Sequence, residues 1–330
     1  GWDSALPVIA WNLWTYRGDR RILDEIYPAL VKYLAYTATK ADADGLVKHG
    51  LGDWVPVNRA HMPSTLFTSS CYYYQAQRIA AEIAALKGLS AEAAQWNAKA
   101  AKTRAGLNRR LYKGNGVYDN GGQTAQAMAL AFGLAEEATR AKVEAQLVAA
   151  VGKAGDHLDV GLYGTKHLFR ALSRMGRTDL AFKLIVNPTK PSMAEWVQKG
   201  GTTLWEDWGD GSSRNHIMFG DFVGWAYQYL AGIRPAETKD STSAVTCAKK
   251  PAFGEVVLAP QPIAALSWAR ASVNGPNGEI VSSWKREGDT VTYDFTVPPN
   301  TVAVIRLPGA APKRVGSGRH TFAVPAHVAP

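Results

Sequence analysis

The chain has 330 residues, 46% of them hydrophobic and 20% charged, which is enough apolar material for one large helical domain or two domains and excludes intrinsic disorder. No run of about 18 uncharged apolar residues occurs, so a membrane-spanning helix is excluded and a membrane partner is not expected. The 37 Lys and Arg outnumber the 28 Asp and Glu, but the basic residues are scattered along the sequence, so nucleic acid is not expected as a partner. The excess positive charge fits an acidic polysaccharide as well as it fits any other polyanion.

Helical periodicity dominates the first 232 residues. The clearest apolar face consists of Ile22, Ile26, Leu30 and Leu34 at i and i+4 spacing, with Asp19 placed to cap the helix. The predicted helices are 7–16, 22–34, 66–86, 91–111, 124–132, 137–151, 162–175, 179–185 and 219–230.

The connections between these helices alternate between very short segments, such as 17–19, and long aromatic ones, such as 43–64 and 187–217. This alternation favours antiparallel helix pairs whose long, functional loops gather at one end. An α/α toroid fits best, and an irregular helical bundle is the alternative.

The composition changes after residue 235. A polar stretch at 236–250 is predicted to link the helical domain, 1–235, to a second domain, 251–330. In the second domain the hydrophobic period drops to two, and strands are predicted at 255–258, 280–284, 291–297 and 302–307. We expect a small antiparallel β-sandwich with a supporting role.

Several chemistries find no support in the sequence. Cys71 and Cys247 lie far apart and form neither a disulfide framework nor a metal-binding spacing. The zinc-protease, P-loop and serine-hydrolase motifs do not occur, so neither a metal nor a cofactor is expected. The sequence opens at Gly1 without an initiator Met, which is expected for a processed product or for a piece of a longer chain.

Tryptophan is the most informative residue type, with 11 occurrences. Core packing accounts for Trp11, Trp14, Trp96 and Trp225. Four others stand beside carboxylates in predicted loops: Trp2 next to Asp3, Trp54 after Asp53, and Trp205 and Trp208 around Glu206 and Asp207. A sugar ring needs an apolar face for stacking and charged groups at its rim, so sugar binding is the leading interpretation, and tryptophans that seal loops onto a scaffold are the alternative.

Glu206 is the strongest candidate for a catalytic carboxylate. A carboxylate between two tryptophans can have its basicity tuned by partial desolvation, as a general base requires. Asp207 and Asp210 are either functional acids or loop caps, and His216 is either functional or a helix cap. Glycoside hydrolysis needs two carboxyl groups, and the sequence offers one strong candidate.

An ordered set of segments resembles the bacterial α-L-rhamnosidases, family 78 of the glycoside hydrolases. The segments are 1–5, 16–23, 52–54, 201–208, 213–216, 219–220, 230–235, 280–284 and 297–301. The resemblance implies an (α/α)6 barrel followed by a β-sandwich, and inverting hydrolysis of terminal, non-reducing α-L-rhamnosyl groups. It implies that Glu206 is the general base, that Trp2 and Trp54 line the rhamnose pocket with His216 nearby, and that Asp53 and Trp205 also bind substrate.

The family's general acid lies in a motif similar to E-R-x-G-W-x-G-D-A, upstream of the segment that Gly1 to Asp3 resembles, and this chain has no counterpart. We therefore expect the acid and the first barrel helices in an upstream segment or chain of the same enzyme, as in a nicked or split enzyme. The expected substrate is a rhamnosylated small molecule or polysaccharide, and the expected location is the periplasm or outside the cell. The alternatives are another α/α-toroid glycosidase, a polysaccharide lyase, or a non-catalytic rhamnose-binding remnant.

Overall fold

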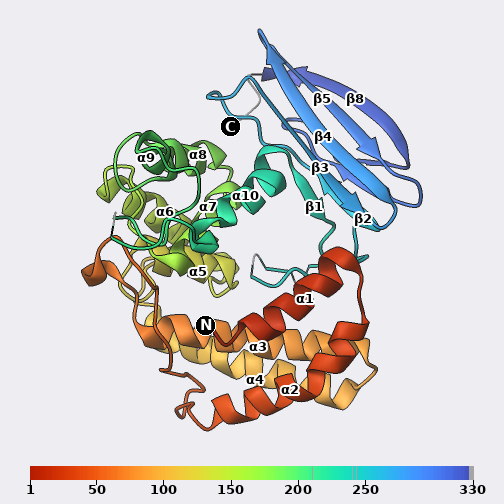
Figure 1. The fold of residues 1–330 in the computed structure, drawn as a ribbon. Coiled ribbons are helices and arrows are strands. Elements are labelled where there is room, and N and C mark those ends of the chain that lie inside the picture. Colours follow the sequence, from red (N-terminus) through yellow and green to blue (C-terminus); the bar gives the residue numbers. More distant parts are fainter. Residues whose placement is uncertain (210, 240, 243, 327–330) are drawn as a thin grey trace.

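The computed structural model describes residues 1–209, 211–239, 241–242 and 244–326, which form a helical domain and a β-sandwich (Figure 1). The α-helices are α1 (Ala5–Arg17), α2 (Arg21–Ala38), α3 (Thr65–Leu86), α4 (Ser90–Leu111), α5 (Gln123–Ala131), α6 (Glu137–Lys153), α7 (Leu162–Arg174), α8 (Thr178–Val186), α9 (Met193–Gln198) and α10 (Asp221–Trp225). Short 3-10 turns occur at Arg59–His61 and Ile217–Phe219, and a π-helical turn, Ala226–Leu230, continues α10.

The helices form two layers. Helices α1, α3, α5, α7 and α10 contact one another in succession, and α1, α3, α5 and α7 each pair with the helix that follows, α2, α4, α6 and α8. The inner helices are the more buried: eight of the nine residues of α5 are buried, whereas only three of the seventeen residues of α6 are. This is the arrangement of an α/α barrel, as predicted, rather than an irregular bundle.

The long connections all precede inner helices. Residues 39–64 lead into α3, 112–122 into α5, 154–161 into α7 and 187–220 towards α10, whereas the hairpin turns are short. Because the inner helices run in the same direction, the long loops lie together at one end of the barrel. Among the described residues, no helix combines the length and the apolar composition that crossing a membrane requires.

Several local predictions needed correction. Asp19 does not occupy the N-cap position of α2, which is Arg20, although its carboxylate accepts a hydrogen bond from the Arg21 backbone N–H. The predicted helix 219–230 is divided among the end of the Ile217–Phe219 turn, the short helix α10 and the π-helical turn Ala226–Leu230. In the π-helical turn the Ala231 N–H donates to the Ala226 carbonyl oxygen, so the hydrogen-bond spacing is i→i+5. Helix α9 falls inside the predicted loop 187–217.

The β-sandwich consists of two four-stranded sheets. Its strands are β1 (Ile233–Pro235), β2 (Glu255–Leu258), β3 (Trp268–Gly275), β4 (Gly278–Glu287), β5 (Thr290–Val297), β6 (Val302–Ile305), β7 (Lys313–Val315) and β8 (Gly318–Pro325). The strand orders are β1-β2-β6-β7 and β3-β4-β5-β8, and the pairs are antiparallel except for β2 with β6, which is parallel. Strands β1, β3, β7 and β8 were not predicted; Pro235 in β1 is tolerated because β1 is an edge strand.

The segment 236–250, predicted as a linker, connects the two domains but is not an exposed tether. Val245 and Cys247 are buried in the same core cluster as α1, α2 and α3, and the Trp11 indole donates to the Thr246 carbonyl oxygen at 2.9 Å. The sandwich also contacts the barrel directly: the Trp284 indole donates to the Leu230 carbonyl oxygen at 2.8 Å. The two domains therefore share packed contacts.

Candidate active site

The start of α7 is the point at which the loops at the open end of the barrel meet. We call residues 160–164 the α7 entry segment. It forms hydrogen bonds with the loop that carries Asp53 and Trp54 and with the loop that carries Glu206. Two groups of predicted site residues, far apart in sequence, are thus connected to one helix start.

Asp53 holds the α7 entry segment in place. Its side chain is 1% exposed; one carboxylate oxygen accepts from the backbone N–H of Tyr163 (2.7 Å) and Gly164 (3.2 Å), the other from Gly161 N–H (2.9 Å) and the Thr124 hydroxyl (2.5 Å). N–H groups in the first turn of a helix have no partner within the helix, so the carboxylate satisfies them. Burial raises the pKa of the Asp53 carboxyl, and the four hydrogen bonds, which stabilise the carboxylate, lower the pKa by a smaller amount. Asp53 therefore fixes the position of the α7 entry segment. Both of its carboxylate oxygens are buried and hydrogen-bonded within the protein, so neither is exposed for the predicted contact with substrate.

Trp54 and Trp2 have exposed side chains near the start of α7. The Trp54 backbone oxygen accepts from Leu162 N–H at 2.9 Å, while its side chain is 40% exposed. Trp2 is 44% exposed and borders a groove of about 230 Å³, which we call the Trp2 groove, together with Leu162, Tyr163 and other residues from α1, α3 and α7. Both tryptophans therefore flank the start of α7 with surface free for stacking.

Glu206 lies on a loop that is closed on itself and anchored to the α7 entry segment. Its backbone N–H donates to the Ser213 carbonyl oxygen (2.9 Å), and its carboxylate accepts from Ser213 N–H (3.3 Å). The Trp208 indole donates to the Val160 carbonyl oxygen at 3.1 Å. Glu206 itself is half-buried, so its carboxylate remains accessible on a fixed loop.

The tryptophans beside Glu206 are core residues, contrary to the expectation that they face a sugar. Trp205 is 2% and Trp208 4% exposed, and both rings stack on Trp196, with ring centroids 5.9 and 5.2 Å apart. The Arg214 guanidinium also lies over the Trp205 ring, 4.7 Å from its centroid. Trp205 has no open face for a sugar ring, and it anchors the Glu206 loop instead; this matches the alternative in which tryptophans seal loops onto the scaffold.

The neighbouring polar residues have local hydrogen-bonding roles. Asp207 accepts from Gly209 N–H (2.6 Å) and from the Ser212 hydroxyl, which is a loop cap. Asp210, the other candidate, lies outside the described residues. His216 caps the Ile217–Phe219 turn, because its Nδ1 accepts from Met218 N–H at 3.1 Å. In the neutral ring the proton is then on Nε2, which leaves His216 able to donate a hydrogen bond.

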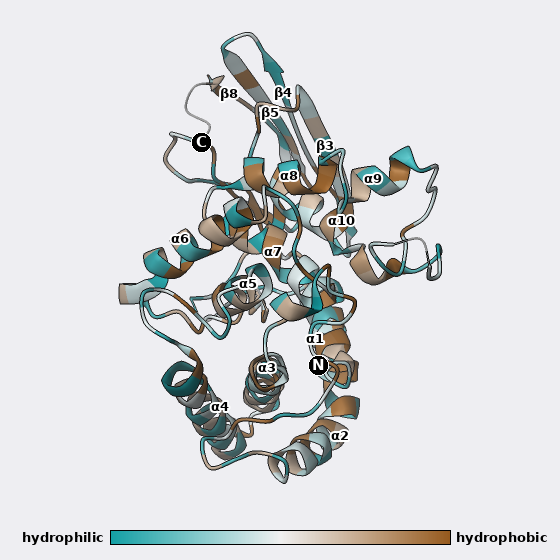
Figure 2. Ribbon diagram, turned by 90° about the vertical axis from the view of Figure 1, so that its left-hand side faces the viewer, coloured by the Kyte–Doolittle hydropathy of each residue, from teal (hydrophilic) through white to brown (hydrophobic). Residues whose placement is uncertain are grey.

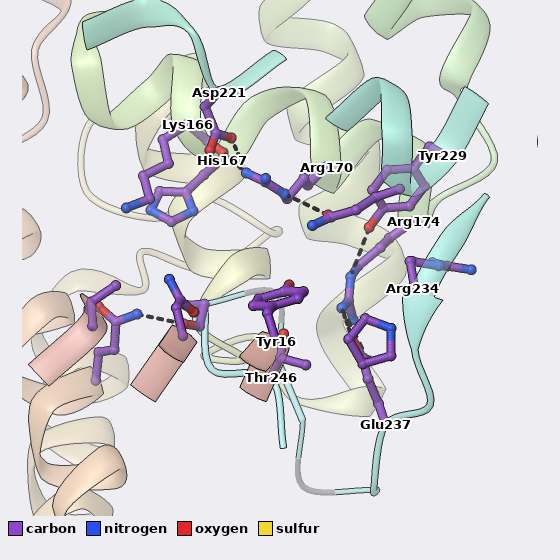
Figure 3. A pocket seen from close by; sticks show the side chains of 16 residues that line it. Tyr16, Lys166, His167, Arg170, Arg174, Asp221, Tyr229, Arg234, Glu237 and Thr246 are labelled. Carbon is purple, nitrogen blue, oxygen red and sulfur yellow. Dashed lines mark hydrogen bonds and ion pairs between the residues drawn. The ribbon is translucent and has the colours of Figure 1, made fainter. Parts of the chain in front are cut away.

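A second, polar cavity of about 240 Å³ lies inside the barrel between α1, α3, α7 and the segment after α10, and we call it the lumen cavity (Figure 3). Figure 3 shows Lys166, Arg170 and Arg174 of α7 along one side of it. Sequence reasoning missed these residues, although their i, i+4, i+8 spacing places them on one helix face. Among the described residues, no group of three or more His, Cys, Asp or Glu side chains is arranged to hold a metal ion.

Comparison with known proteins gives a consistent result. The family model for the bacterial α-L-rhamnosidase six-hairpin glycosidase domain matches residues 1–230, and the model for the C-terminal domain of the same enzymes matches residues 245–322. Among curated proteins, an α-L-rhamnosidase of Formosa agariphila is 29% identical over 93% of this chain, and one of Streptomyces avermitilis is 28% identical over 98%. The chain spans about a third of the length of these relatives, 34% and 31%.

Solved structures agree in fold. The Streptomyces avermitilis α-L-rhamnosidase in complex with L-rhamnose superposes with a TM-score of 0.86 at 26% identity, over 96% of this chain and 32% of that one. The α-L-rhamnosidase of Dictyoglumus thermophilum gives 0.87 at 26% identity, over 98% of this chain and 39% of that one. Both the barrel helices and the sandwich are therefore shared.

Proposed function

Because the chain belongs to the bacterial α-L-rhamnosidases, we propose that it supplies the general base and the aromatic pocket of an inverting enzyme that removes terminal α-L-rhamnose. The observation that carries this proposal is the accessible carboxylate of Glu206 on a loop anchored to the α7 entry segment, which also positions Trp54. Binding alone does not require such a carboxylate.

In the proposed reaction each side chain has one task. Trp54 and Trp2 stack on apolar sugar faces, and the Nε2–H of His216 donates to a sugar hydroxyl. Glu206 takes a proton from a water molecule, which attacks the anomeric carbon as the bond to the leaving oxygen breaks. Asp53 and Trp205 act through their neighbours, by fixing the α7 entry segment and the Glu206 loop.

The general acid that protonates the leaving oxygen is proposed to lie in a part of the enzyme upstream of this sequence, in the same or another chain. Two observations support this. The chain spans about a third of the length of its relatives. Helix α1, which has brown, hydrophobic stretches in Figure 2, exposes the apolar side chains of Leu6, Ile9 and Leu13. Exposed apolar surface on a barrel helix is what a missing neighbouring helix would cover. The proposed substrate is a rhamnosylated small molecule or polysaccharide, met in the periplasm or outside the cell.

The test is Glu206→Gln in the complete enzyme, with an aryl α-L-rhamnoside as substrate. Loss of the base is expected to lower kcat by about 10²–10⁴-fold, while rhamnose binding measured by calorimetry is retained. Glu279→Gln, an exposed residue of β4, is the matched control and should leave kcat unchanged.

The stereochemistry is checked by NMR of the first product formed. Release of the β-anomer of rhamnose supports inversion, whereas initial α-rhamnose means retention and an unsaturated sugar means a lyase. Wild-type kcat in Glu206→Gln would remove Glu206 from the base role. Rhamnose binding without any turnover in the complete enzyme would leave only a binding remnant.

A further inference from the structure

The open end of the barrel contains a pocket that has no role in the proposed reaction. Residues 60–61, 117–123 and 154–159 of the loops before α3, α5 and α7 line it, together with the end of α6. Its volume is about 450 Å³, within the range of about 300–1,000 Å³ that is typical of small-ligand sites. We call it the His61 pocket.

One wall of the His61 pocket is apolar and made of small residues. Helix α6 supplies Ala149 and Ala150, Ala154 follows directly after the helix, and Val117 comes from the loop before α5. Short side chains leave space against the helix, and their CH groups can contact the apolar face of a sugar ring.

The polar side chains of the pocket are held in place by the protein itself. The ring nitrogen Nδ1 of His61 lies 2.6 Å from a carboxylate oxygen of Asp159. The Asn120 amide donates to the His61 carbonyl oxygen at 2.8 Å. The Gln123 amide accepts from the Asp159 N–H at 3.1 Å and donates to the His157 carbonyl oxygen at 2.9 Å. These contacts join the three loops around the pocket, so its shape is formed without a ligand.

Both donors and acceptors remain available for a ligand. Lys153 is exposed at the end of α6 and can donate. The Gln146 amide nitrogen donates to the Asn115 carbonyl oxygen at 3.3 Å, which leaves the amide oxygen of Gln146 as an acceptor. Asp159 directs one carboxylate oxygen at the His61 ring, and its other oxygen can accept. Because a hydroxyl both donates and accepts, this mixed set beside an apolar wall suits the hydroxyl groups of a sugar.

The His61 pocket adjoins the α7 entry segment. Asp159 directly precedes this segment, and His61, which it contacts, lies on the loop that also carries Trp54. The pocket is therefore at the same end of the barrel as Trp54 and the Glu206 loop. A glycan chain that presents its terminal rhamnose at this end has the pocket beside it.

We propose that the His61 pocket binds a sugar unit of the glycan chain that carries the terminal rhamnose, as a second contact besides the rhamnose site. The inference deepens the proposed function and rests on it, because it takes the substrate to be a rhamnose-bearing glycan. An aromatic aglycone fits the pocket less well, because no Trp, Tyr or Phe is among the described residues that line it.

The experiment measures binding to the complete enzyme, so it depends neither on turnover nor on the role of Glu206. The probe is a rhamnogalacturonan oligosaccharide from which the terminal rhamnose has been removed, and calorimetry gives its affinity. The blocking variant is Ala149→Trp, which places an indole in the pocket from an exposed position of α6. Ala141→Trp, at an exposed position of the same helix outside the pocket, is the matched control.

Ala149→Trp is expected to weaken oligosaccharide binding about tenfold or more, because the indole occupies the space of the sugar ring. Lys153→Gln is expected to weaken it about three- to tenfold, the effect of one hydrogen bond. Ala141→Trp should bind the oligosaccharide as the wild type does. If Ala149→Trp does not fold, the exposed position Lys153 alone decides the outcome.

The proposal is overturned if the oligosaccharide does not bind the wild type, which is also the result if another part of the complete enzyme fills the pocket. Affinities of Ala149→Trp and Lys153→Gln that equal the wild-type affinity overturn it as well. So does an equal loss of binding in Ala141→Trp and Ala149→Trp, because the effect then does not come from the pocket. A failed Glu206→Gln test leaves all of these outcomes readable, since no turnover is measured.

Discussion

Trp54 and Trp205 carry the same side chain in opposite environments. Trp54 is 40% exposed at the start of α7, and Trp205 is 2% exposed and stacked on Trp196. Both stand beside a carboxylate in the sequence, so composition and spacing treat them alike. Only the packing of the loops leaves the Trp54 ring exposed and buries the Trp205 ring.

Alanine at Trp54 should therefore affect substrate binding, whereas alanine at Trp205 should affect stability. Trp54→Ala is expected to raise KM for an aryl rhamnoside and leave the free energy of unfolding nearly unchanged. Trp205→Ala is expected to lower the free energy of unfolding by about 3–5 kcal/mol, the usual cost of removing a buried tryptophan. Kinetics and urea denaturation of both variants check this, and a stable Trp205→Ala enzyme with a raised KM would contradict it.

His167 makes stability depend on pH. Its ring is buried beside Phe132, with ring centroids 5.1 Å apart, and its Nε2 lies 3.3 Å from the Tyr72 hydroxyl. Burial lowers the pKa of His167 well below its ordinary value, and the charges of Lys166 and Arg170 lower it further. The neutral ring is thus the folded form.

Because the folded-state pKa lies below the unfolded value of about 6.5, the contribution of His167 is complete above that pH and is lost as the pH falls below it. Between about pH 6.5 and 5 the slope attributable to His167 approaches 1.4 kcal/mol per pH unit. His167→Gln, which cannot titrate, should show a shallower fall over the same window in urea denaturation. Identical slopes would rule this explanation out.

At the scale of elements, the N-terminus of α7 depends on a residue outside its own helix. Asp53 accepts hydrogen bonds from three backbone N–H groups of residues 161–164 and from the Thr124 hydroxyl. One carboxylate thus connects the loop before α3 to the starts of α5 and α7. The long loops depend on this contact for their position relative to one another.

Asp53→Ala is expected to cost about 3 kcal/mol or more, because each buried donor left without an acceptor costs about 1–3 kcal/mol. Asp53→Asn keeps one acceptor oxygen and should cost less. Denaturation curves give both values, and Asp289→Ala, an exposed aspartate in the β4–β5 turn, should change neither stability nor activity. A large loss of activity in Asp53→Asn without a loss of stability would instead indicate direct contact with substrate.

At the scale of the whole molecule, the barrel and the sandwich form one packed unit. The Trp284 indole and the Ser282 hydroxyl of β4 donate to the carbonyl oxygens of Leu230 and Ala231 at the end of the barrel. Tyr16 of α1 packs against Phe253, with ring centroids 5.9 Å apart. Because of these contacts, the residues that follow the last inner helix of the barrel pack on the sheet and are not exposed to solvent.

The two domains are therefore expected to unfold in a single calorimetric transition. Trp284→Phe keeps most of the buried area but leaves the Leu230 carbonyl oxygen without its donor, which should lower stability by about 1–3 kcal/mol. Scanning calorimetry of the variant checks this. Two separate transitions already present in the wild type would show that the interface does not couple the domains.

The sequence by itself determined the helices with a clear apolar face, the antiparallel pairing of the helices and the change from helix to strand near residue 235. These features are local: the periods of 3.6 and 2 are written into neighbouring residues. Strands β3, β7 and β8 were missed because none of their residues is fully buried and the inward-facing positions of β3 are mostly small, so their apolar alternation is weak. The family, too, is indicated by the sequence, because the order of the matching segments is a property of the chain itself.

Only the tertiary structure decided which of the candidate residues share a site and what each one contacts. Asp53, Trp54, Val160 and Trp208 meet at the start of α7, although up to 155 positions separate them. The burial of Trp205 and the saturated carboxylate of Asp53 both arise from contacts between segments distant in the chain. Local pattern carries no information on such contacts, because burial and hydrogen-bond partners are set by how the layers pack.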